Sequence, residues 1–318
     1  MDEGAEIIVE RSEAIANIAS EDWDALVGDS DPFIEHAFLA ELERSESVGP
    51  PETGWVPCHL TARRKGRLVG AMPLYKKTHS YGEYIFDWAW AQASHRAGVP
   101  YYPKLVSAVP FSPVTGRRLL IADGEDPVAV TAALAEALGE AAEELGCWSV
   151  HVLFCTEEER VALGAAGLLE RETHQYHWHR RPEWGCFEDY LSAMRSRARK
   201  EIRRERRLAR DSGLRFEWRT GEETTPEDWA AMWRFYSDTT DRKYGSAYLN
   251  EAFFCGLRDR LKHRAHLALA YDGETPQAGA LFLEKGDRLI GRYWGTSGCA
   301  PHVHFELCYY MPLERCLE

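Results

Sequence analysis

Stretches with helical and with strand-like spacing of hydrophobic residues alternate along the first half of the chain. Residues 32–45 have helical spacing, with Asp31 suited to cap the first turn and Pro32 to occupy its first position. Residues 126–145 are rich in Ala and Leu and end before a glycine, which indicates another helix. Residues 157–166 indicate a third, short helix. Strand-like segments occupy residues 56–63, 67–76, 104–109, 118–121, 148–154 and 168–179.

A similar order of helices and strands follows a break at residues 182–185. Turn sequences at 272–273 and 286–287 join the last three strands into an antiparallel meander. Pro312 should interrupt or kink the final helix. We therefore expect an α/β (α+β) protein of two lobes, residues 1–182 and 183–318, each with a mixed, mainly antiparallel sheet flanked by helices. The elements expected in the second lobe are a helix from residue 187, helices at 195–210, 226–239, 248–261 and 303–317, and strands at 215–219, 265–271, 277–285 and 288–294.

Composition is compatible with two folded lobes and excludes several classes of protein. Hydrophobic residues make up 45% of the 318 residues and aromatic residues 12%, which supplies enough apolar surface for two cores. The acidic N-terminus and the lack of a long apolar stretch predict neither a signal peptide nor a membrane span. The eight cysteines are scattered without a C-x-x-C pair, so we expect reduced thiols in a cytoplasmic protein.

Charge singles out residues 195–210, because they carry nine Arg or Lys against two Glu in a chain whose net charge is −13. At about 100° per residue, six arginines fall on one side of the expected helix. They are Arg195, Arg199, Arg203, Arg206, Arg207 and Arg210. Met194, Ala198, Ile202, Leu208 and Ala209 fall on the other side, which can pack on a core.

Two interpretations of the basic helix remain open. It is either a solvated face balanced by acids elsewhere, or a binding surface for phosphate, as in a nucleotide, coenzyme A or the tRNA backbone. Glu205 falls on the apolar side of the helix, where an unpaired carboxylate is costly. We expect it either to pair with an arginine or to bind a substrate amine.

Longer sequence blocks carry a resemblance to a known family. In the first half they are G-W-x-P-x-H-L at 54–60, G-A-M-P-L-Y at 70–75, H-S-Y-G-E-Y-x-F-D-W-A-W-A at 79–91 and Y-Y-P-K-L at 101–105. In the second half they are R-K-x-I-R-R-E-R at 199–206, G-R-Y-W-G at 291–295 and H-F-E-x-C-Y-Y at 304–310. Together they resemble the bacterial predicted N-acyltransferases labelled peptidoglycan biosynthesis/recognition proteins, a family related to the Fem aminoacyltransferases.

The resemblance implies two tandem GNAT-like lobes with a basic helix opening the second. It also implies further strands after the last helix, so we expect the second lobe to lack its final strands. The donor's pyrophosphate would meet a helix N-terminus after a Q/R-x-x-G-x-G/A loop. The corresponding sequence runs from Arg292 through Trp294 and Gly295 to Ala300, with Ser297 where the loop has its next glycine.

Candidate proton-handling and substrate-binding groups gather at two places. In the first half, strand alternation would bring His79, Tyr81 and Glu83 onto one face, lining a cleft between the lobes or orienting the surrounding aromatic residues. Asp87, Trp88 and Lys104 are further candidates for contact with substrate. In the second half, the candidates are His304, Glu306, Tyr309 and Tyr310, with Arg292, Trp294 and Gly295 for binding. Glu306 could act as a general base through water, or only favour the helix dipole.

These observations predict an N-acyltransferase that uses acyl-CoA or aminoacyl-tRNA as donor and a small-molecule or peptide amine as acceptor. Arg199, Arg203, Arg206 and Arg292 would hold phosphates. No G-x-S-x-G motif is present, which argues against a serine hydrolase. The pairs His177/His179 and His302/His304 have ligand spacing, but without a third ligand we expect no metal. The alternatives are a non-catalytic module that binds RNA, such as tRNA, or an anionic precursor, and a homodimer that completes an open sheet.

Overall fold

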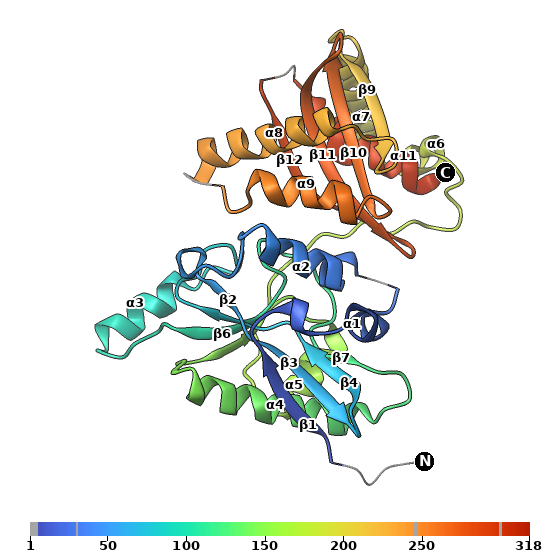
Figure 1. The fold of residues 1–318 in the computed structure, drawn as a ribbon. Helices are drawn as coiled ribbons and strands as arrows, with labels where there is room; N and C mark the ends of the chain where they lie inside the picture. Colours follow the sequence, from blue (N-terminus) through green and yellow to red (C-terminus); the bar gives the residue numbers. More distant parts are fainter. Residues whose placement is uncertain (1–5, 30, 245–246, 299–300) are drawn as a thin grey trace. The chain divides into compact units, whose positions relative to one another are not determined.

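The protein divides into two compact units, Met1–Glu172 (unit 1) and Thr173–Glu318 (unit 2). The structure, a computed structural model, describes residues 6–29, 31–244, 247–298 and 301–318. This division between units 1 and 2 falls ten residues before the lobe boundary that we expected at 182/183. The expected boundary stays a prediction. Figure 1 shows the elements of each unit.

Unit 1 has two four-stranded sheets flanked by helices (Figure 1). One sheet has the order β1-β3-β4-β7 with antiparallel neighbours, and the other the order β2-β5-β6-β8, in which β6 and β8 run parallel. Its strands are β1 (Ile8–Ser12), β2 (Trp55–Pro57), β3 (His59–Arg64), β4 (Arg67–Met72), β5 (Tyr75–Lys77), β6 (Lys104–Ser107), β7 (Leu120–Ile121) and β8 (Val150–Val152). Its helices are α1 (Ser20–Val27), α2 (His36–Arg44), α3 (Trp88–Arg96), α4 (Pro127–Glu144) and α5 (Glu157–Ala165).

Proline chemistry explains where the elements of unit 1 differ from the expected ones. The strands expected at 56–63 and 67–76 are each divided, near Pro57 and Pro73, because proline has no N–H for the ladder. The strand pairs then continue in the second sheet. The helix expected at 32–45 is divided as well. Asp31 caps a short 3₁₀ turn, Pro32–Ile34, and α2 begins after it.

The expected strand at 168–179 was wrong, because the structure has no strand there. The segment has no neighbouring strand to pair with, and its apolar side chains Leu169 and Tyr176 are almost fully exposed. Without pairing or a face to bury, apolar alternation does not produce a strand. Helix α3 was not expected at all.

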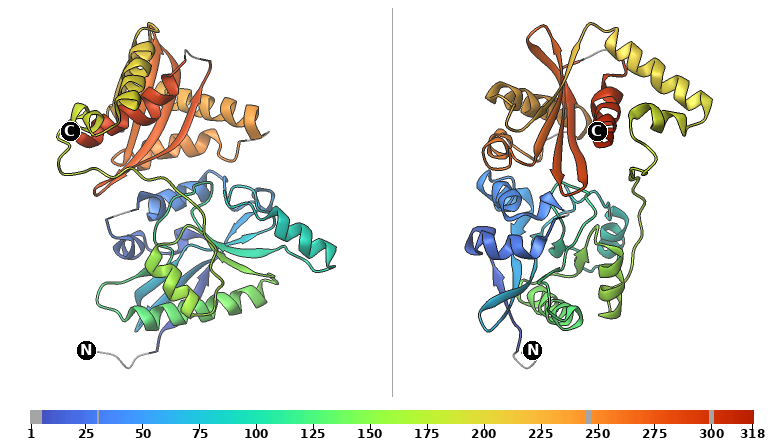
Figure 2. Two further views of the ribbon diagram at one scale, coloured as in Figure 1. Left: turned by 180° about the vertical axis from the view of Figure 1, so that it is seen from behind. Right: turned by 90° about the vertical axis from the view of Figure 1, so that its right-hand side faces the viewer.

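Unit 2 is built on one antiparallel sheet in the order β12-β11-β10-β9. Helices α8 and α9 cover one face of this sheet, and the C-terminal helical segment covers the other, with α7 packed against that segment (Figure 2). The strands are β9 (Arg215–Thr220), β10 (Ala265–Asp272), β11 (Thr275–Lys285) and β12 (Arg288–Thr296). The helices are α6 (Phe187–Ser192), α7 (Ser196–Arg210), α8 (Pro226–Tyr244), α9 (Glu251–Arg260), α10 (Val303–Phe305) and α11 (Met311–Leu317).

The last helix of the chain continues past Pro312 by changing its winding. A π-helical turn, η4 (Glu306–Tyr310), lies between α10 and α11, so Pro312 falls at the start of the last segment, where its missing N–H costs little. Small residues of the sheet, among them Ala268, Ala270 and Ala280, pack against Val303 and Leu307 of this helical segment. The close approach fixes the segment on the sheet, and with it the side chains considered below.

Candidate functional site

Helix α7 displays a row of cations to solvent. Two of these arginines have partners. The exposed Arg203 forms an ion pair with Glu188 at 2.5 Å, and the half-buried Arg199 donates a hydrogen bond to the Ser192 carbonyl at 3.4 Å. The side chains of the other exposed cations have no hydrogen-bond or ion-pair partner within the part of the chain that the structure describes, and we call these residues the cationic face. They are Arg195, Arg197, Lys200, Arg204, Arg207 and Arg210. Six positive charges without acidic partners attract anions.

The helix is turned differently from the expectation based on periodicity alone. Arg206, expected among the exposed arginines, is buried, whereas Leu208, expected on the packed side, is exposed. Arg206 donates to both oxygens of Glu306, at 2.8 to 3.1 Å, and to Glu314 at 2.7 Å. Burial opposes its charge, but these hydrogen bonds prevail and raise its pKa. An arginine occupies the packed side because two carboxylates neutralise it.

Glu306 and Glu205 therefore have different chemical environments. Glu306 is only 3% exposed, and both its oxygens are held by Arg206. Glu205 is half-buried and accepts a hydrogen bond from the Tyr310 hydroxyl. Its Oε1 lies 3.7 Å from His302 Nδ1. Its hydrogen-bond partner is thus a tyrosine and not an arginine, which was one of the two expected alternatives. Burial and the bond to Glu205 raise the pKa of Tyr310.

A cluster of aromatic rings covers the C-terminal segment beside Glu205. The His304 ring lies edge-on to Trp294, with centroids 4.8 Å apart, and 5.7 Å from the Tyr309 ring. Phe305 lies 5.9 Å from Tyr309, and both of these side chains are exposed. His304, Trp294 and Tyr309 are thus brought together, as a surface that a flat ligand group can contact.

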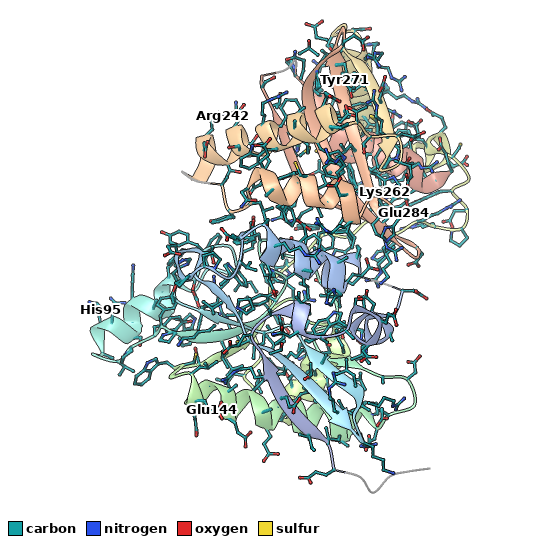
Figure 3. The ribbon with its side chains drawn as sticks, viewed as in Figure 1. His95, Glu144, Arg242, Lys262, Tyr271 and Glu284 are labelled. Carbon is teal, nitrogen blue, oxygen red and sulfur yellow. The ribbon has the colours of Figure 1, made fainter. Side chains whose placement is uncertain are left out.

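The expected phosphate loop has a structural role at its first glycine. Gly295 is buried within β12, and a Cβ there would come within 2.0 Å of the Phe235 carbonyl oxygen, so only glycine allows this close packing on α8. The Arg292 guanidinium lies over the Tyr293 ring at 4.6 Å. Cys299 and Ala300 lie outside the described residues. Beyond β12, a cavity of about 250 Å³ is lined by Asp238, Asp241, Arg242, Thr296 and Ser297 (Arg242 is labelled in Figure 3).

In unit 1, residues 79–87 form a loop, so the strand alternation expected for His79, Tyr81 and Glu83 was wrong. Gly82 and Tyr84 both have a positive φ, which a strand does not tolerate. His79 accepts a hydrogen bond from the Tyr81 N–H at 3.3 Å, and its ring lies against Gly54, where no side chain would fit. Burial, with the nearby Lys77, lowers the pKa of His79.

Lys104 is the centre of a buried group of charges, which we call the Lys104 cluster. Its Nζ donates to Glu83 at 2.8 Å, to Asp87 at 2.5 Å and to Ser80 at 2.9 Å. Tyr101 adds a hydrogen bond to Asp87 at 2.6 Å. Burial raises the pKa of Glu83; at Asp87 the same effect is outweighed by the hydrogen bonds from Lys104, Ser80 and Tyr101, which lower its pKa. Lys104, Glu83 and Asp87 thus anchor the 79–87 loop and are not exposed to solvent.

A second buried lysine lies beside this cluster and is bound differently. Lys77 donates to the Tyr81 carbonyl at 3.1 Å, and its Nζ lies 3.7 Å from the centroid of the Trp55 ring. It has no carboxylate within ion-pair distance among the described residues. Burial lowers its pKa to about 6, so at neutral pH this amine is mostly uncharged.

Helix α3 forms one wall of a cavity of about 420 Å³, which we call the α3 pocket. Five of its lining residues recur at helical spacing along α3, and His79 and Tyr102 lie on the other side. Figure 3 labels His95 on this helix. Trp88 is 39% exposed, packs edge-on against Tyr81 at 5.2 Å, and stacks on Phe86. The α3 residues that line the pocket are Trp88, Ala91, Gln92, His95 and Arg96.

Several residues at these sites were not expected from the sequence. Lys77, Ser80, Tyr101 and Tyr102 lie within or next to the blocks that carry the family resemblance, but neither periodicity nor charge distinguishes them. Gln92, His95 and Arg96 were missed because α3 itself was missed. A helical count from Trp88, at positions i+4, i+7 and i+8, would have grouped them on one face.

Two further properties concern the described residues as a whole. No group of three or more His, Cys, Asp or Glu side chains there has the geometry to hold a metal ion. No helix in those ranges is both long and apolar enough to span a membrane.

Comparison with known proteins gives one family and several similar folds. The family model FemAB-like, described as peptidoglycan biosynthesis/recognition, matches residues 14–318. The crystal structure of FemX is 14% identical, with a TM-score of 0.51 over 96% of this chain and 85% of that one. A conserved protein of unknown function from Bacteroides thetaiotaomicron is 10% identical, with a TM-score of 0.52 over 96% and 86%. No curated protein matches this chain.

A tandem GNAT protein from the clavulanic acid biosynthesis pathway is 12% identical, with a TM-score of 0.44 over 98% of this chain and 87% of that one. The family match confirms the resemblance found in the sequence blocks. The expected α/β (α+β) fold, with mainly antiparallel sheets flanked by helices, is confirmed as well.

Proposed function

We propose that this chain, which belongs to the FemAB-like family of peptidoglycan biosynthesis/recognition proteins, is an N-acyltransferase. It would move an acyl or aminoacyl group from acyl-CoA or aminoacyl-tRNA to an amine of a cell-wall precursor or peptide. The observation that carries this proposal is the family match. It runs through both units and includes the candidate residues of each unit. A family related to peptidoglycan, on a fold shared with FemX, is the context in which such transfer is expected.

The cationic face supports a phosphate-bearing donor. Both donor classes carry several phosphates, and α7 offers six exposed cations that form no ion pair with an acidic group of the described residues. A surface of this kind attracts a polyanion by releasing its counterions, which makes binding depend on salt. Arg199 and Arg203 lie next to this face and can add contacts, whereas Arg206 is occupied by Glu306 and Glu314.

The reaction itself asks for proton transfer and for stabilisation of an oxyanion. The amine attacks the acyl carbonyl, the amine nitrogen loses a proton, and the departing thiolate or ribose oxygen takes one up. His304 and Tyr309 are placed at the surface of unit 2 where they can contact a ligand. Glu205 retains more freedom than Glu306, because Tyr310 and not an arginine is bound to it. Of these two carboxylates of unit 2, Glu205 is therefore the one that can exchange a proton with a ligand or with solvent, and Glu306 is not.

A second function is favoured by the same cationic face. A module that binds tRNA or an anionic cell-wall precursor without catalysis would need those six cations and none of the acid–base groups. Its affinity would fall steeply with salt, because many phosphate contacts are made. Transfer activity separates the two proposals.

The test is a transfer assay with the full chain and both donors. Purified protein is incubated with radiolabelled acetyl-CoA, or with a mixture of radiolabelled aminoacyl-tRNAs, and with amine acceptors that include amino acids, dipeptides and cell-wall pentapeptides. The proposal expects label in an amide product from one donor class. Binding of tRNA with no transfer from either donor would instead support the non-catalytic module. Because both donors are made in the cytoplasm, that is where we expect the protein to act.

A further inference from the structure

The α3 pocket lies wholly within unit 1 and combines an aromatic wall with positive charge. Trp88 is 39% exposed and lines the pocket, although tryptophan is usually buried. Arg96 and His95 lie two turns further along the helix, and no carboxylate lines the pocket. An occupant that matches these walls has an apolar or flat part over Trp88 and an anionic group toward Arg96.

The opposite wall connects the pocket to the buried charges. The Tyr102 hydroxyl, on the lining, is 2.7 Å from Ser80 Oγ. Ser80 in turn is hydrogen-bonded to Lys104, at 2.9 Å, and to the Asp87 carboxylate. A continuous chain of hydroxyls thus leads from the pocket to a pair of carboxylates.

Each of the two carboxylates at the end of this hydrogen-bonded series has an oxygen atom that can still accept a hydrogen bond or a proton. Oε1 of Glu83 and Oδ1 of Asp87 are buried and have no hydrogen-bond partner among the described residues. Both side chains are at least 97% buried. Buried polar atoms of this kind call for an explanation, and a role in proton transfer is one. Burial raises the pKa of Glu83, so Glu83 is the carboxylate of the two that more readily takes up an additional proton.

We propose that the α3 pocket binds the amine acceptor, and that Tyr102 is the catalytic residue that removes the amine proton, an inference that rests on the proposed acyl transfer. The acceptor would be an amine with an apolar part and a carboxylate, held by Trp88 and Arg96. Ser80 and Lys104 are positioning residues that connect Tyr102 to the carboxylates.

The protons and bonds balance in this scheme. The amine nitrogen forms a bond to the acyl carbon, and the bond to the donor's sulfur or ribose oxygen breaks. The nitrogen gives its proton to the Tyr102 oxygen, Tyr102 gives its own to Ser80, and Ser80 gives its own to Asp87. Lys104, which donates to both carboxylates, hands one proton to Glu83 and takes that of Asp87. The leaving group takes a proton from water, and the stored proton returns to solvent after product release.

Binding is tested first, by calorimetry, because it does not depend on activity. The probe is the dipeptide phenylalanyl-glutamate, which has the amine, the ring and the carboxylates. Trp88→Ala should weaken its binding about tenfold, since it removes the aromatic wall. Trp90→Ala is the matched control, because Trp90 is on the same helix, 62% exposed and outside the lining, and should change binding less than about twofold. Replacing the carboxylates by amides should also weaken binding about tenfold.

Other binding results would overturn the assignment. No binding of the dipeptide at millimolar concentration would do so, as would equal binding by the two tryptophan variants. Adenosine diphosphate, the other source of a flat ring with negative charge, is the second probe. If it binds in a Trp88-dependent way and the dipeptide does not, the pocket is a nucleotide site and not the acceptor site.

The catalytic part is tested by Tyr102→Phe, which keeps the ring and removes the hydroxyl. We expect kcat to fall about 100-fold or more with KM unchanged, as for the loss of a general base. Tyr176→Phe, at an almost fully exposed tyrosine, is the control. An unchanged kcat in a folded Tyr102→Phe protein would overturn the role of Tyr102 and leave the proposed function standing. If the wild type transfers nothing, the proposed function fails, and calorimetry still decides what the pocket binds.

Discussion

The Lys104 cluster of unit 1 buries a cation between two carboxylates, whereas helix α7 of unit 2 displays most of its cations to solvent. Lys104 is fully buried between Glu83 and Asp87, and the loop that carries these acids forms one side of the α3 pocket. The side chains of the six residues of the cationic face form no ion pair or hydrogen bond with an acidic group of the described residues. Buried charges hold a structure in place, because their removal leaves partners unpaired, whereas exposed charges are available to a ligand. The comparison therefore predicts stability effects in unit 1 and binding effects on α7.

The largest effect is expected at Lys104. Lys104→Met removes the cation between Glu83 and Asp87, and should lower the free energy of unfolding by about 3–5 kcal/mol, the usual cost of leaving a buried charge unpaired. Lys77→Met is the matched control, since Lys77 is equally buried but mostly uncharged at pH 7. It should cost less than about 1.5 kcal/mol, as a volume-conserving change. Urea unfolding measures both, and equal losses would contradict the assigned charge states.

A pair of neighbouring arginines sharpens the comparison within α7. Arg206→Met leaves Glu306 buried without its partner and should cost about 3 kcal/mol. Arg207→Met changes an exposed side chain without an acidic partner among the described residues, and should shift stability by no more than about 0.5 kcal/mol. Thermal and urea unfolding of the two variants would distinguish them. Equal effects would mean that α7 is not turned as described.

A smaller effect concerns the pH dependence of unit 1. Lys77 has a pKa of about 6 in the folded protein against an ordinary 10.5. Between these values the unfolded chain binds a proton that the folded chain has released, so the free energy of unfolding rises with pH. From pH 6.5 to 8.5 this group alone should add about 2.5 kcal/mol, at about 1.4 kcal/mol per pH unit. Lys77→Met should lose this rise, and an identical pH dependence in both proteins would refute the lowered pKa.

Sequence patterns predicted the fold much better than the sites. The meander of β10–β12, the long α4 and the basic α7 follow local rules of spacing, turns and caps, which the structure keeps. Periodicity did not determine which side of α7 is packed. Glu306 and Glu314, about a hundred residues away in the sequence, neutralise the charge of Arg206 and so allow it to be buried. Likewise the 79–87 loop is held by the hydrogen bonds of Lys104 to Glu83 and Asp87, and no local sequence pattern predicts those hydrogen bonds. Charged residues buried by distant partners are the part that a single sequence conceals.

The proposed transfer requires that the cationic face of α7 holds the phosphates of the acyl donor. The most direct measurement is the salt dependence of donor binding by wild type and by a variant with Arg197, Lys200, Arg204 and Arg207 changed to glutamine. For aminoacyl-tRNA, the slope of log K against log salt should become shallower by about 3, at roughly 0.7–0.9 per lost phosphate contact. Stability should be unchanged. The same slope and affinity in the folded variant would contradict the claim.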